Sequence, residues 1–242
     1  MLSTWGQTLP IEMTEHNGAD RVQVMFKGIA SRYDLMNRLM TGGQDIRWRR
    51  EVIRRAELPA DGQLLDLGAG TGDLAREALL QKPLCRPFAA DFTLEMMQVG
   101  KGRHNSTILD WSAADALALP FPSGIFDAVV SGFLLRNVAS IDQALDEQYR
   151  VLKPGGSIVA LDTTRPERNL LWPLINLHLN YLIPNLGQLI TGQRDAYTYL
   201  PESTEAFLVA EQLRTRMQAA GFREVGFRRL MFGTVAIHWA KK

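Results

Sequence analysis

An apolar run that stops at a group of spaced glycines is the feature that most constrains the fold. Residues 64–73 read Leu-Leu-Asp-Leu-Gly-Ala-Gly-Thr-Gly-Asp, and a stretch of helix-forming residues follows. Glycine adopts backbone angles that other residues avoid, so this spacing predicts a buried strand that turns tightly into a helix. In open α/β sheets such a turn lies beyond the carboxyl end of the first strand, where nucleotide-like ligands bind. The sequence therefore predicts an α/β enzyme with a nucleotide cofactor.

The spacing of these glycines distinguishes between classes of cofactor. A dinucleotide-binding loop has the pattern Gly-x-Gly-x-x-Gly, which starting at Gly68 requires a glycine where this chain has Asp73. We expect that carboxylate to repel a pyrophosphate and to tolerate a cationic or zwitterionic ligand. The pattern Asp-x-Gly-x-Gly-x-Gly, which begins at Asp66, resembles motif I of the S-adenosylmethionine-dependent methyltransferases. A nicotinamide or flavin cofactor, or a loop without a ligand, is the alternative.

Beyond the first strand, short apolar runs alternate with helical patterns. We predict strands over 63–67, 86–90, 108–112, 126–132, 157–162, 222–230 and 234–240, with helices over 74–81, 94–101, 141–151 and 204–220. Such alternation indicates a mostly parallel sheet with helices on both faces. The short connection at 231–233 makes the last two strands an antiparallel hairpin. This α/β arrangement of seven strands is similar to the Rossmann-like fold of the class I methyltransferases.

The chain is predicted to hold one domain with two additions. Its 242 residues and hydrophobic content of 46% suffice for a single well-buried core. We expect residues 1–21 to form a flexible N-terminus and 22–242 a single methyltransferase domain. Within that domain, 22–58 are predicted to form a helical cap and 165–200 an apolar lid or insertion.

Charge and cysteine content exclude several classes of function. The 27 basic and 26 acidic residues nearly cancel, so we expect no nucleic-acid partner. The single cysteine, Cys85, excludes an intramolecular disulfide and fits a reducing compartment. With only four histidines beside it, we expect no metal site. We see no secretory signal, and polar residues interrupt the apolar region 170–190, so we expect a cytoplasmic protein.

Candidate cofactor ligands follow the predicted strands. Asp91, after the second strand, has the position of an acid that accepts hydrogen bonds from ribose hydroxyls, although it could instead cap the next helix. Thr71 is expected to bind the amino-acid end of the cofactor or to satisfy the turn backbone. The methyltransferase resemblance places the adenine near Asp115 and Ala116, for which a surface turn is the alternative. The full candidate set is Asp66, Gly68, Gly70, Thr71, Gly72, Asp91, Asp115, Ala116 and Gly132.

Segments outside this loop resemble one family. Residues 33–37 read Tyr-Asp-Leu-Met-Asn, residues 132–138 Gly-Phe-Leu-Leu-Arg-Asn-Val, and residues 197–200 Tyr-Thr-Tyr-Leu. With the run Tyr-Arg-Val-Leu-Lys-Pro-Gly-Gly at 149–156, they closely resemble the ubiquinone/menaquinone biosynthesis C-methyltransferases of the UbiE/MenG type. The resemblance implies S-adenosylmethionine-dependent C-methylation of a demethylated polyprenyl quinol.

The sequence also departs from that family's usual pattern. Residues 44–48 differ from a common His-Arg-x-Trp segment, Asp162 replaces a common glutamate, and 163–168 are atypical. These changes fall near the expected acceptor pocket, so the choice between benzoquinol and naphthoquinol stays open. Another small apolar acceptor, such as a sterol or lipid, and a non-catalytic cofactor-binding scaffold are the alternative functions.

Activation of a quinol carbon needs a proton acceptor or a positive group beside the phenolic oxygen. We expect Arg136 to stabilise the phenolate, because a guanidinium stays charged and cannot act as a base. Asn137 would orient a water or a ring oxygen, and Tyr33 would reach the acceptor. The alternatives are a buried structural salt bridge for Arg136 and core packing for Tyr33. His178 lies in a Leu-rich stretch, where a structural histidine is expected rather than a catalytic base.

A lipophilic quinol implies partners at a membrane. The apolar region 170–190 and the excess of arginines between Arg32 and Arg55 could serve a peripheral membrane contact, although a solvated helix face also explains the arginines. The expected partners are thus a small lipophilic quinol and the membrane surface, with a homodimer left open.

Overall fold

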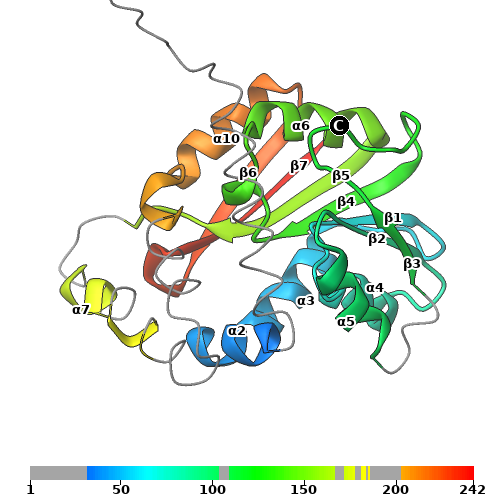
Figure 1. The fold of residues 1–242 in the computed structure, drawn as a ribbon. Helices are drawn as coiled ribbons and strands as arrows, with labels where there is room; N and C mark the ends of the chain where they lie inside the picture. Colours follow the sequence, from blue (N-terminus) through cyan, green and yellow to red (C-terminus); the bar gives the residue numbers. More distant parts are fainter. Residues whose placement is uncertain (1–31, 104–108, 167–171, 178–180, 184, 186–202) are drawn as a thin grey trace, which may run out of the picture.

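A twisted sheet forms the centre of the molecule. The computed structural model describes residues 32–103, 109–166, 172–177, 181–183, 185 and 203–242. Within them, a seven-stranded sheet has the order β3-β2-β1-β4-β5-β7-β6 (Figure 1). Its strands are β1 (Gln63–Leu67), β2 (Arg86–Asp91), β3 (Asp110–Ala113), β4 (Phe126–Gly132), β5 (Leu152–Thr163), β6 (Arg223–Leu230) and β7 (Val235–Lys241).

The pairing of the strands confirms the predicted topology. Strands β1 to β5 are parallel, whereas β7 runs antiparallel to both β5 and β6. The short 3-10 helix η4 (Met231–Gly233) joins β6 to β7 at the predicted connection. Strand β5 begins at Leu152, earlier than predicted, because the Lys-Pro-Gly-Gly segment already continues the strand.

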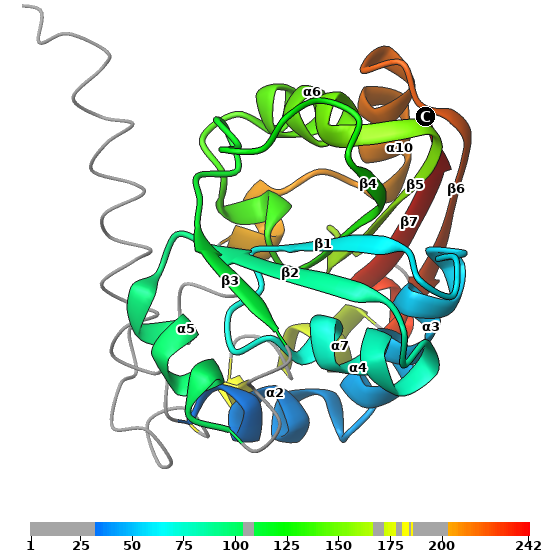
Figure 2. The ribbon, with the colours of Figure 1, turned by 90° about the vertical axis from the view of Figure 1, so that its right-hand side faces the viewer.

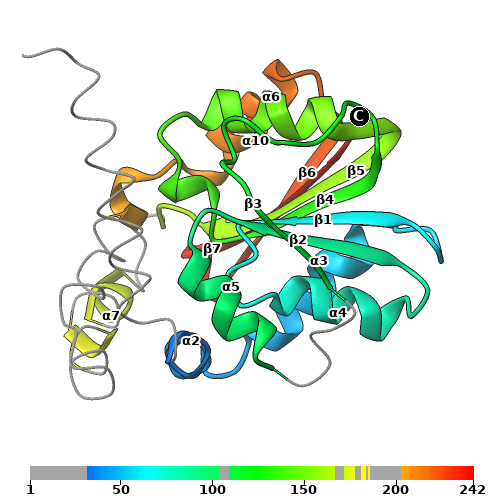
Figure 3. The same cartoon turned by 45° about the vertical axis from the view of Figure 1, so that its right-hand side comes forward.

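Helices cover both faces of this sheet. Helices α3 (Asp45–Arg55), α4 (Asp73–Gln81) and α5 (Leu94–Lys101) lie on one face, and α6 (Ile141–Val151) and α10 (Ala210–Ala219) on the other (Figure 2). Helices α2 (Tyr33–Thr41) and α7 (Trp172–Leu177) lie further out, on the side of α3 and α4 (Figure 3). Among the helices that the structure describes, none is long and apolar enough to cross a bilayer.

Each face of the sheet has its own apolar core. Leu145 of α6 and Met217 of α10 are fully buried on one face, and Trp48 and Val52 of α3 are buried on the other. Full burial of such side chains contributes roughly 1.5–3 kcal/mol each. The two cores hold the carboxyl ends of the strands in fixed positions, and the candidate site lies at these ends.

The region predicted as a helical cap divides into two parts with different surroundings. Helix α3 packs through Trp48, Val52 and Ile53 into the core beneath β4 and β5, so it belongs to the layer that covers the sheet. Helix α2 reaches the loop that follows β1, where its Asp34 accepts a hydrogen bond from Thr71. The predicted N-terminus, 1–21, lies outside the described residues, and so does most of the predicted lid, 165–200.

The helix predicted over 204–220 is wrong in its first part. Residues 203–206 form a separate helical turn, Val209 is extended, and α10 begins only at Ala210. The Thr164 hydroxyl donates to the Leu208 carbonyl at 3.2 Å, and the Arg165 guanidinium donates to the Phe207 carbonyl at 3.1 Å. These bonds attach the chain to the end of β5 and divert two carbonyls from helical pairing, which helical periodicity in the sequence cannot reveal.

Candidate functional site

The glycine loop between β1 and α4 requires glycine for two reasons. Gly68, Gly70 and Gly72 have φ angles of 67°, 56° and 83°, in the left-handed region that other residues avoid. A Cβ atom on Gly68 would also lie 2.8 Å from Leu134, and one on Gly72 would lie 2.8 Å from Trp111. The loop therefore packs closely against the residues that follow β4 and against Trp111 of β3, and the predicted tight turn is confirmed.

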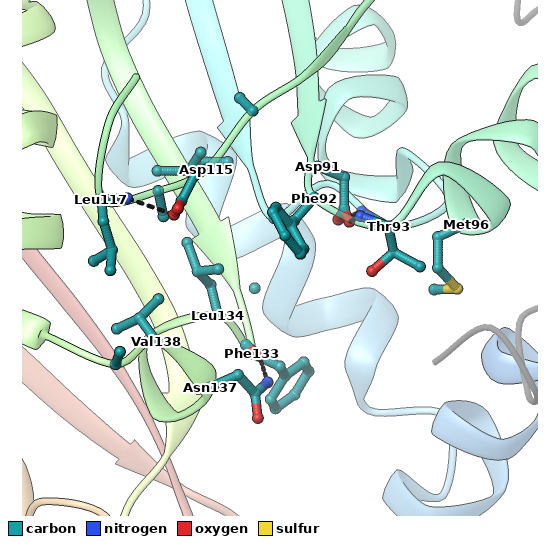
Figure 4. Close-up of a pocket in the computed structure, with 17 residues that line it drawn as sticks. Asp91, Phe92, Thr93, Met96, Asp115, Leu117, Phe133, Leu134, Asn137 and Val138 are labelled. Carbon is teal, nitrogen blue, oxygen red and sulfur yellow. Dashed lines mark hydrogen bonds between the residues drawn. The ribbon is translucent and has the colours of Figure 1, made fainter. Parts of the chain in front are cut away.

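A cavity opens beside this loop at the carboxyl ends of β1, β2 and β4. Figure 4 shows Asp91, Thr93 and Met96 on one side of it, with Leu117, Leu134 and Val138 opposite. We call it the first cavity. The predicted residues that line it are Gly68, Gly70, Asp91, Asp115, Ala116, Gly132 and Asn137.

Asp91 holds the backbone on both sides of the first cavity, and ribose binding by its carboxylate stays a prediction. Its carboxylate accepts hydrogen bonds from the backbone N–H of Gly70 and of Thr93, both at 2.7 Å, so it holds the glycine loop and the start of α5. Burial raises the pKa of Asp91, and the two N–H donors oppose that rise. An ionised carboxylate has about four acceptor positions, so the side chain can also accept from hydroxyl groups in the cavity.

Asp115 and Ala116 form a turn on the opposite wall. The Asp115 carboxylate accepts from the Leu117 backbone N–H at 2.9 Å, and its side chain is exposed (Figure 4). Ala116 is buried, and both residues line the first cavity. Asp115 and Ala116 thus form a surface turn, the alternative considered from the sequence. The same turn borders the cavity in which a ligand would bind.

A second cavity lies behind the glycine loop, between the loop and α2. Its wall includes Asp34 and Asn37 of α2, Arg49 of α3, and Asp66 and Thr71. One Asp66 oxygen accepts from the Ala75 backbone N–H at 3.0 Å, and burial raises the pKa of this carboxyl to about 7. Helix α2 thus adds residues to the site that the glycine motif did not indicate. Gly72 lines neither of these two cavities and serves the turn itself.

Charged side chains connect the loop to three helices. The Thr71 hydroxyl donates to Asp34 at 3.0 Å, and Arg103 forms ion pairs with Asp34 and Asp73. Arg49 reaches the same Asp73 carboxylate at 3.0 Å. The charge of Asp73 is therefore compensated, which corrects the argument that this carboxylate by itself repels a pyrophosphate. No local pattern in the sequence pointed to Arg103.

The predicted catalytic residues occupy three different surroundings. Arg136 forms an ion pair with Asp162 at 2.9 Å, with side chains only 7% and 2% exposed, and lines neither cavity. Asn137 lines the first cavity and donates its amide to the Phe133 carbonyl at 2.9 Å. Tyr33 begins α2, but its side chain lies outside the described residues, as does His178.

Phe133 lies between the two cavities and lines both of them. Its φ angle is 61°, in the left-handed region that a bulky residue rarely adopts. The residue directly follows β4, where the backbone turns into the 3-10 helix η2 (Leu135–Asn137). The centre of its ring also lies 5.1 Å from the Arg136 guanidinium, so the ring contacts that buried ion pair as well as the cavities.

Comparisons with known proteins agree with this geometry. The model of the ubiE/COQ5 methyltransferase family matches residues 13–242. The ubiquinone/menaquinone biosynthesis C-methyltransferase UbiE of Desulfotalea psychrophila is 45% identical over 221 residues, covering 91% of this chain and 90% of that protein. The demethylmenaquinone methyltransferase of Thermus thermophilus is 44% identical over 216 residues, covering 88% of this chain and 98% of that protein.

Solved structures share the fold at low sequence identity. The [4+2]-cyclase SpnF superimposes with a TM-score of 0.66 at 20% identity, covering 93% of this chain and 96% of that one. Phosphoethanolamine N-methyltransferase 2 of Haemonchus contortus, solved with S-adenosyl-L-methionine, gives a TM-score of 0.61 at 15% identity, covering 81% of this chain and 52% of that one. The predicted class I methyltransferase fold is confirmed.

Proposed function

The chain belongs to the ubiE/COQ5 methyltransferase family, and we propose on that basis that it transfers a methyl group from S-adenosylmethionine to a ring carbon of a demethylated polyprenyl quinol. The names of the family and of these relatives agree with the enzyme class, the cofactor and the link to quinone biosynthesis that the sequence predicted. The observation that carries the proposal is the extent of the family match, which includes every described residue of both cavities.

The walls of the first cavity fit the nucleoside part of this cofactor. Asp91 has acceptor capacity for ribose hydroxyls, and Asp115 can accept from an exocyclic amine. Phe92, Met96 and Leu134 offer apolar surface for a flat base. When bound, the cofactor supplies a methyl group already activated on a sulfonium, so the protein's task is to orient the acceptor and to exclude water.

For the acceptor we propose roles for two residues that follow β4 and for one residue of α2. Asn137 would orient a ring oxygen from the wall of the first cavity. Arg136, one residue before it, would favour the phenolate electrostatically, with Asp162 holding the guanidinium in place. Tyr33 would approach from α2. The position of Asn137 in the cavity and the buried pair beside it support this assignment.

We further propose that the acceptor is taken up at a membrane surface. On α2, Leu35 and Leu39 are 52% and 46% exposed, and Arg38 is exposed beside them. Tyr181 and Leu182 are also exposed, at 60% and 50%. Exposed leucines beside an arginine suit the interface of an anionic bilayer. The homodimer stays a prediction, which light scattering of the purified protein tests.

Incubation with labelled S-adenosylmethionine tests the proposed reaction. Demethylated benzoquinols and naphthoquinols, each with a polyprenyl tail, serve as acceptors, with a sterol and a fatty-acyl lipid as comparison substrates. We expect label in a ring carbon of a quinol. Label in a comparison lipid alone would establish a different acceptor class, and donor binding without transfer to any acceptor would indicate a scaffold protein.

A further inference from the structure

Three consecutive residues in the turn between β6 and β7 have left-handed backbone angles. Met231, Phe232 and Gly233, the residues of η4, have φ angles of 46°, 55° and 86°. Glycine adopts this region freely, whereas a bulky side chain is strained there. Such strain persists only where the surrounding structure holds it, and it concentrates at functional sites. The closure of a hairpin does not explain it, because glycine or asparagine closes a hairpin without this strain.

The two strained residues of η4 differ in what their side chains contact. Met231 is half-buried and packs against the core on the α3 face. Phe232 is 73% exposed, more than any other aromatic side chain that the structure describes. The core therefore holds the turn on one side, and the strained backbone presents the ring of Phe232 to the surroundings of the protein.

The exposed ring lies at the edge of the sheet where the candidate site is. Val235, the first residue of β7, pairs with Thr163, the last residue of β5. The Thr164 backbone N–H also donates to the Thr234 carbonyl at 2.9 Å. Since β5 is parallel to β4 and β1, its end marks the same carboxyl edge as the two cavities. Neither cavity includes a residue of η4, so Phe232 lies beside the site rather than in it.

The charges of the hairpin favour an anionic partner. Residues 225–242 include four lysines and arginines and no aspartate or glutamate. Near the turn, Arg229 forms an ion pair with Glu211, but the Arg228 side chain is 51% exposed, with Glu51 at 3.8 Å. An anionic surface can therefore approach the turn without meeting a carboxylate of the hairpin itself.

A bilayer suits these features better than a second protein does. A stable protein interface buries about 800 Å² on each partner, far more than one ring on a tight turn offers. The interface of a membrane instead accepts single aromatic side chains, with a cation beside them that reaches the headgroups. Helix α2, at the same edge, also exposes Leu35 and Leu39, so apolar side chains are exposed at two separate places around the site.

We propose that η4 is a membrane anchor, in which the strained backbone directs Phe232 into the interface of an anionic bilayer. This inference rests on the proposed uptake of the acceptor at a membrane and adds a second contact to that of α2. Two contacts on different elements fix the orientation of the protein, so the edge with both cavities faces the bilayer. A lipophilic acceptor then passes from the membrane to the site without crossing water.

Flotation with vesicles of equal parts phosphatidylcholine and phosphatidylglycerol at low salt tests the anchor. Phe232→Asn removes the ring and keeps the fold, because asparagine tolerates a left-handed backbone. We expect its vesicle binding to fall about tenfold or more, as loss of one buried apolar side chain does. Leu84→Asn is the matched control, since Leu84 is 72% exposed and remote from the site, and it should bind vesicles as the wild type does.

A tryptophan at the same position reports the insertion directly. Phe232→Trp adds one indole to the five of the wild type, and vesicles with brominated acyl chains quench an indole that enters them. We expect stronger quenching of the variant than of the wild type. Methyl transfer to a detergent-solubilised quinol should be unchanged in Phe232→Asn, because the residue lies outside both cavities.

Wild-type vesicle binding by Phe232→Asn, or an added tryptophan that is not quenched, overturns the anchor and leaves the proposed reaction standing. Slower transfer by Phe232→Asn in detergent would assign the ring to the acceptor, and a changed oligomeric state by light scattering would assign it to a second copy. Either result overturns the anchor. Wild-type protein that methylates no quinol in detergent overturns the proposed function and not the anchor.

Discussion

At the scale of single residues, the pair of Arg136 and Asp162 decides how catalysis can be tested. Both side chains are buried, so each is the main compensation for the charge of the other. Burial raises the pKa of Asp162, and Arg136 opposes that rise. Removing one partner leaves an uncompensated buried charge, at a cost of about 3–5 kcal/mol. A single substitution therefore mixes lost folding stability with any lost activation of the acceptor.

A double variant separates these two effects. Arg136→Met combined with Asp162→Asn removes both charges and keeps an oxygen for the Thr163 backbone N–H, so we expect folding stability much closer to wild type than that of either single variant. We expect turnover to fall about 100-fold or more while affinity for S-adenosylhomocysteine stays within about threefold. The measurements are thermal unfolding, kcat and calorimetry. A stable double variant with wild-type kcat would show that the pair is structural only.

The raised pKa of Asp66 predicts in which direction the free energy of unfolding changes with pH. Burial raises its pKa to about 7 in the folded protein, above the value of about 3.9 of an unfolded chain. Between these values the folded state holds the extra proton, so the free energy of unfolding falls as the pH rises from about 4 to about 7. Asp66→Asn keeps an oxygen for the Ala75 N–H and removes the titration.

We therefore expect the melting temperature of Asp66→Asn to change less between about pH 5 and about pH 8 than that of the wild type. Asp91 and Asp162 titrate in both proteins, so the difference between the two melting curves isolates Asp66. Curves that run parallel over this range would mean that Asp66 is ionised throughout.

At the scale of elements, the turn from β1 into α4 should be the least tolerant part of the site. Gly68→Ala combines a left-handed φ of 67° with a contact of 2.8 Å to Leu134. Gly155→Ala is the matched control, because its φ is 77° and nothing lies within 4 Å of the added carbon. Both variants carry backbone strain of about 1–2 kcal/mol, but only the first also displaces the wall of the first cavity.

We expect Gly68→Ala to lower S-adenosylhomocysteine affinity by about tenfold and Gly155→Ala to leave it unchanged, although both melt at lower temperature. Calorimetry and thermal unfolding provide the two readouts. If both variants lost affinity equally, general destabilisation would explain the effect, and the loop would have no special part in binding.

At the scale of the whole molecule, two pairs of exposed leucines lie near opposite ends of the strands. Leu35 and Leu39 lie on α2, beside the site, whereas Leu80 lies in the last turn of α4 and Leu84 follows that helix, before β2. Because α4 runs away from the glycine loop, this second pair is at the edge remote from the site. The two pairs have similar chemistry, but only the first has a position suited to the uptake of a membrane-held acceptor.

We expect Leu35→Ser with Leu39→Ser to lower binding to anionic phospholipid vesicles by about tenfold or more, since each leucine contributes roughly 1.5–3 kcal/mol when buried. Leu80→Ser with Leu84→Ser should change vesicle binding little. Flotation at low salt provides the measurement. An equal loss for both pairs, or no binding by the wild type, would contradict membrane contact through α2.

The part of the site that could be predicted from the sequence is the part built from strand ends. Glycine spacing and apolar runs place Gly68, Asp91 and Asp115 at one edge, because parallel strands end together. The rest depends on side chains that meet across helices. Arg103 reaches Asp73 from the end of α5, and no local pattern encodes that contact. Likewise, the sequence could not tell on which side of the turn after β4 Arg136 would lie.

The left-handed backbone of Phe133 has a consequence for substitutions at this position. A glycine at this position would relieve the local conformational penalty, but it would also remove a ring that packs against the core on the α3 face. The ring also lines both cavities, so the same substitution would enlarge the site. Phe133→Gly should therefore change the melting temperature little, because relief of strain and loss of packing oppose each other, and it should slow turnover.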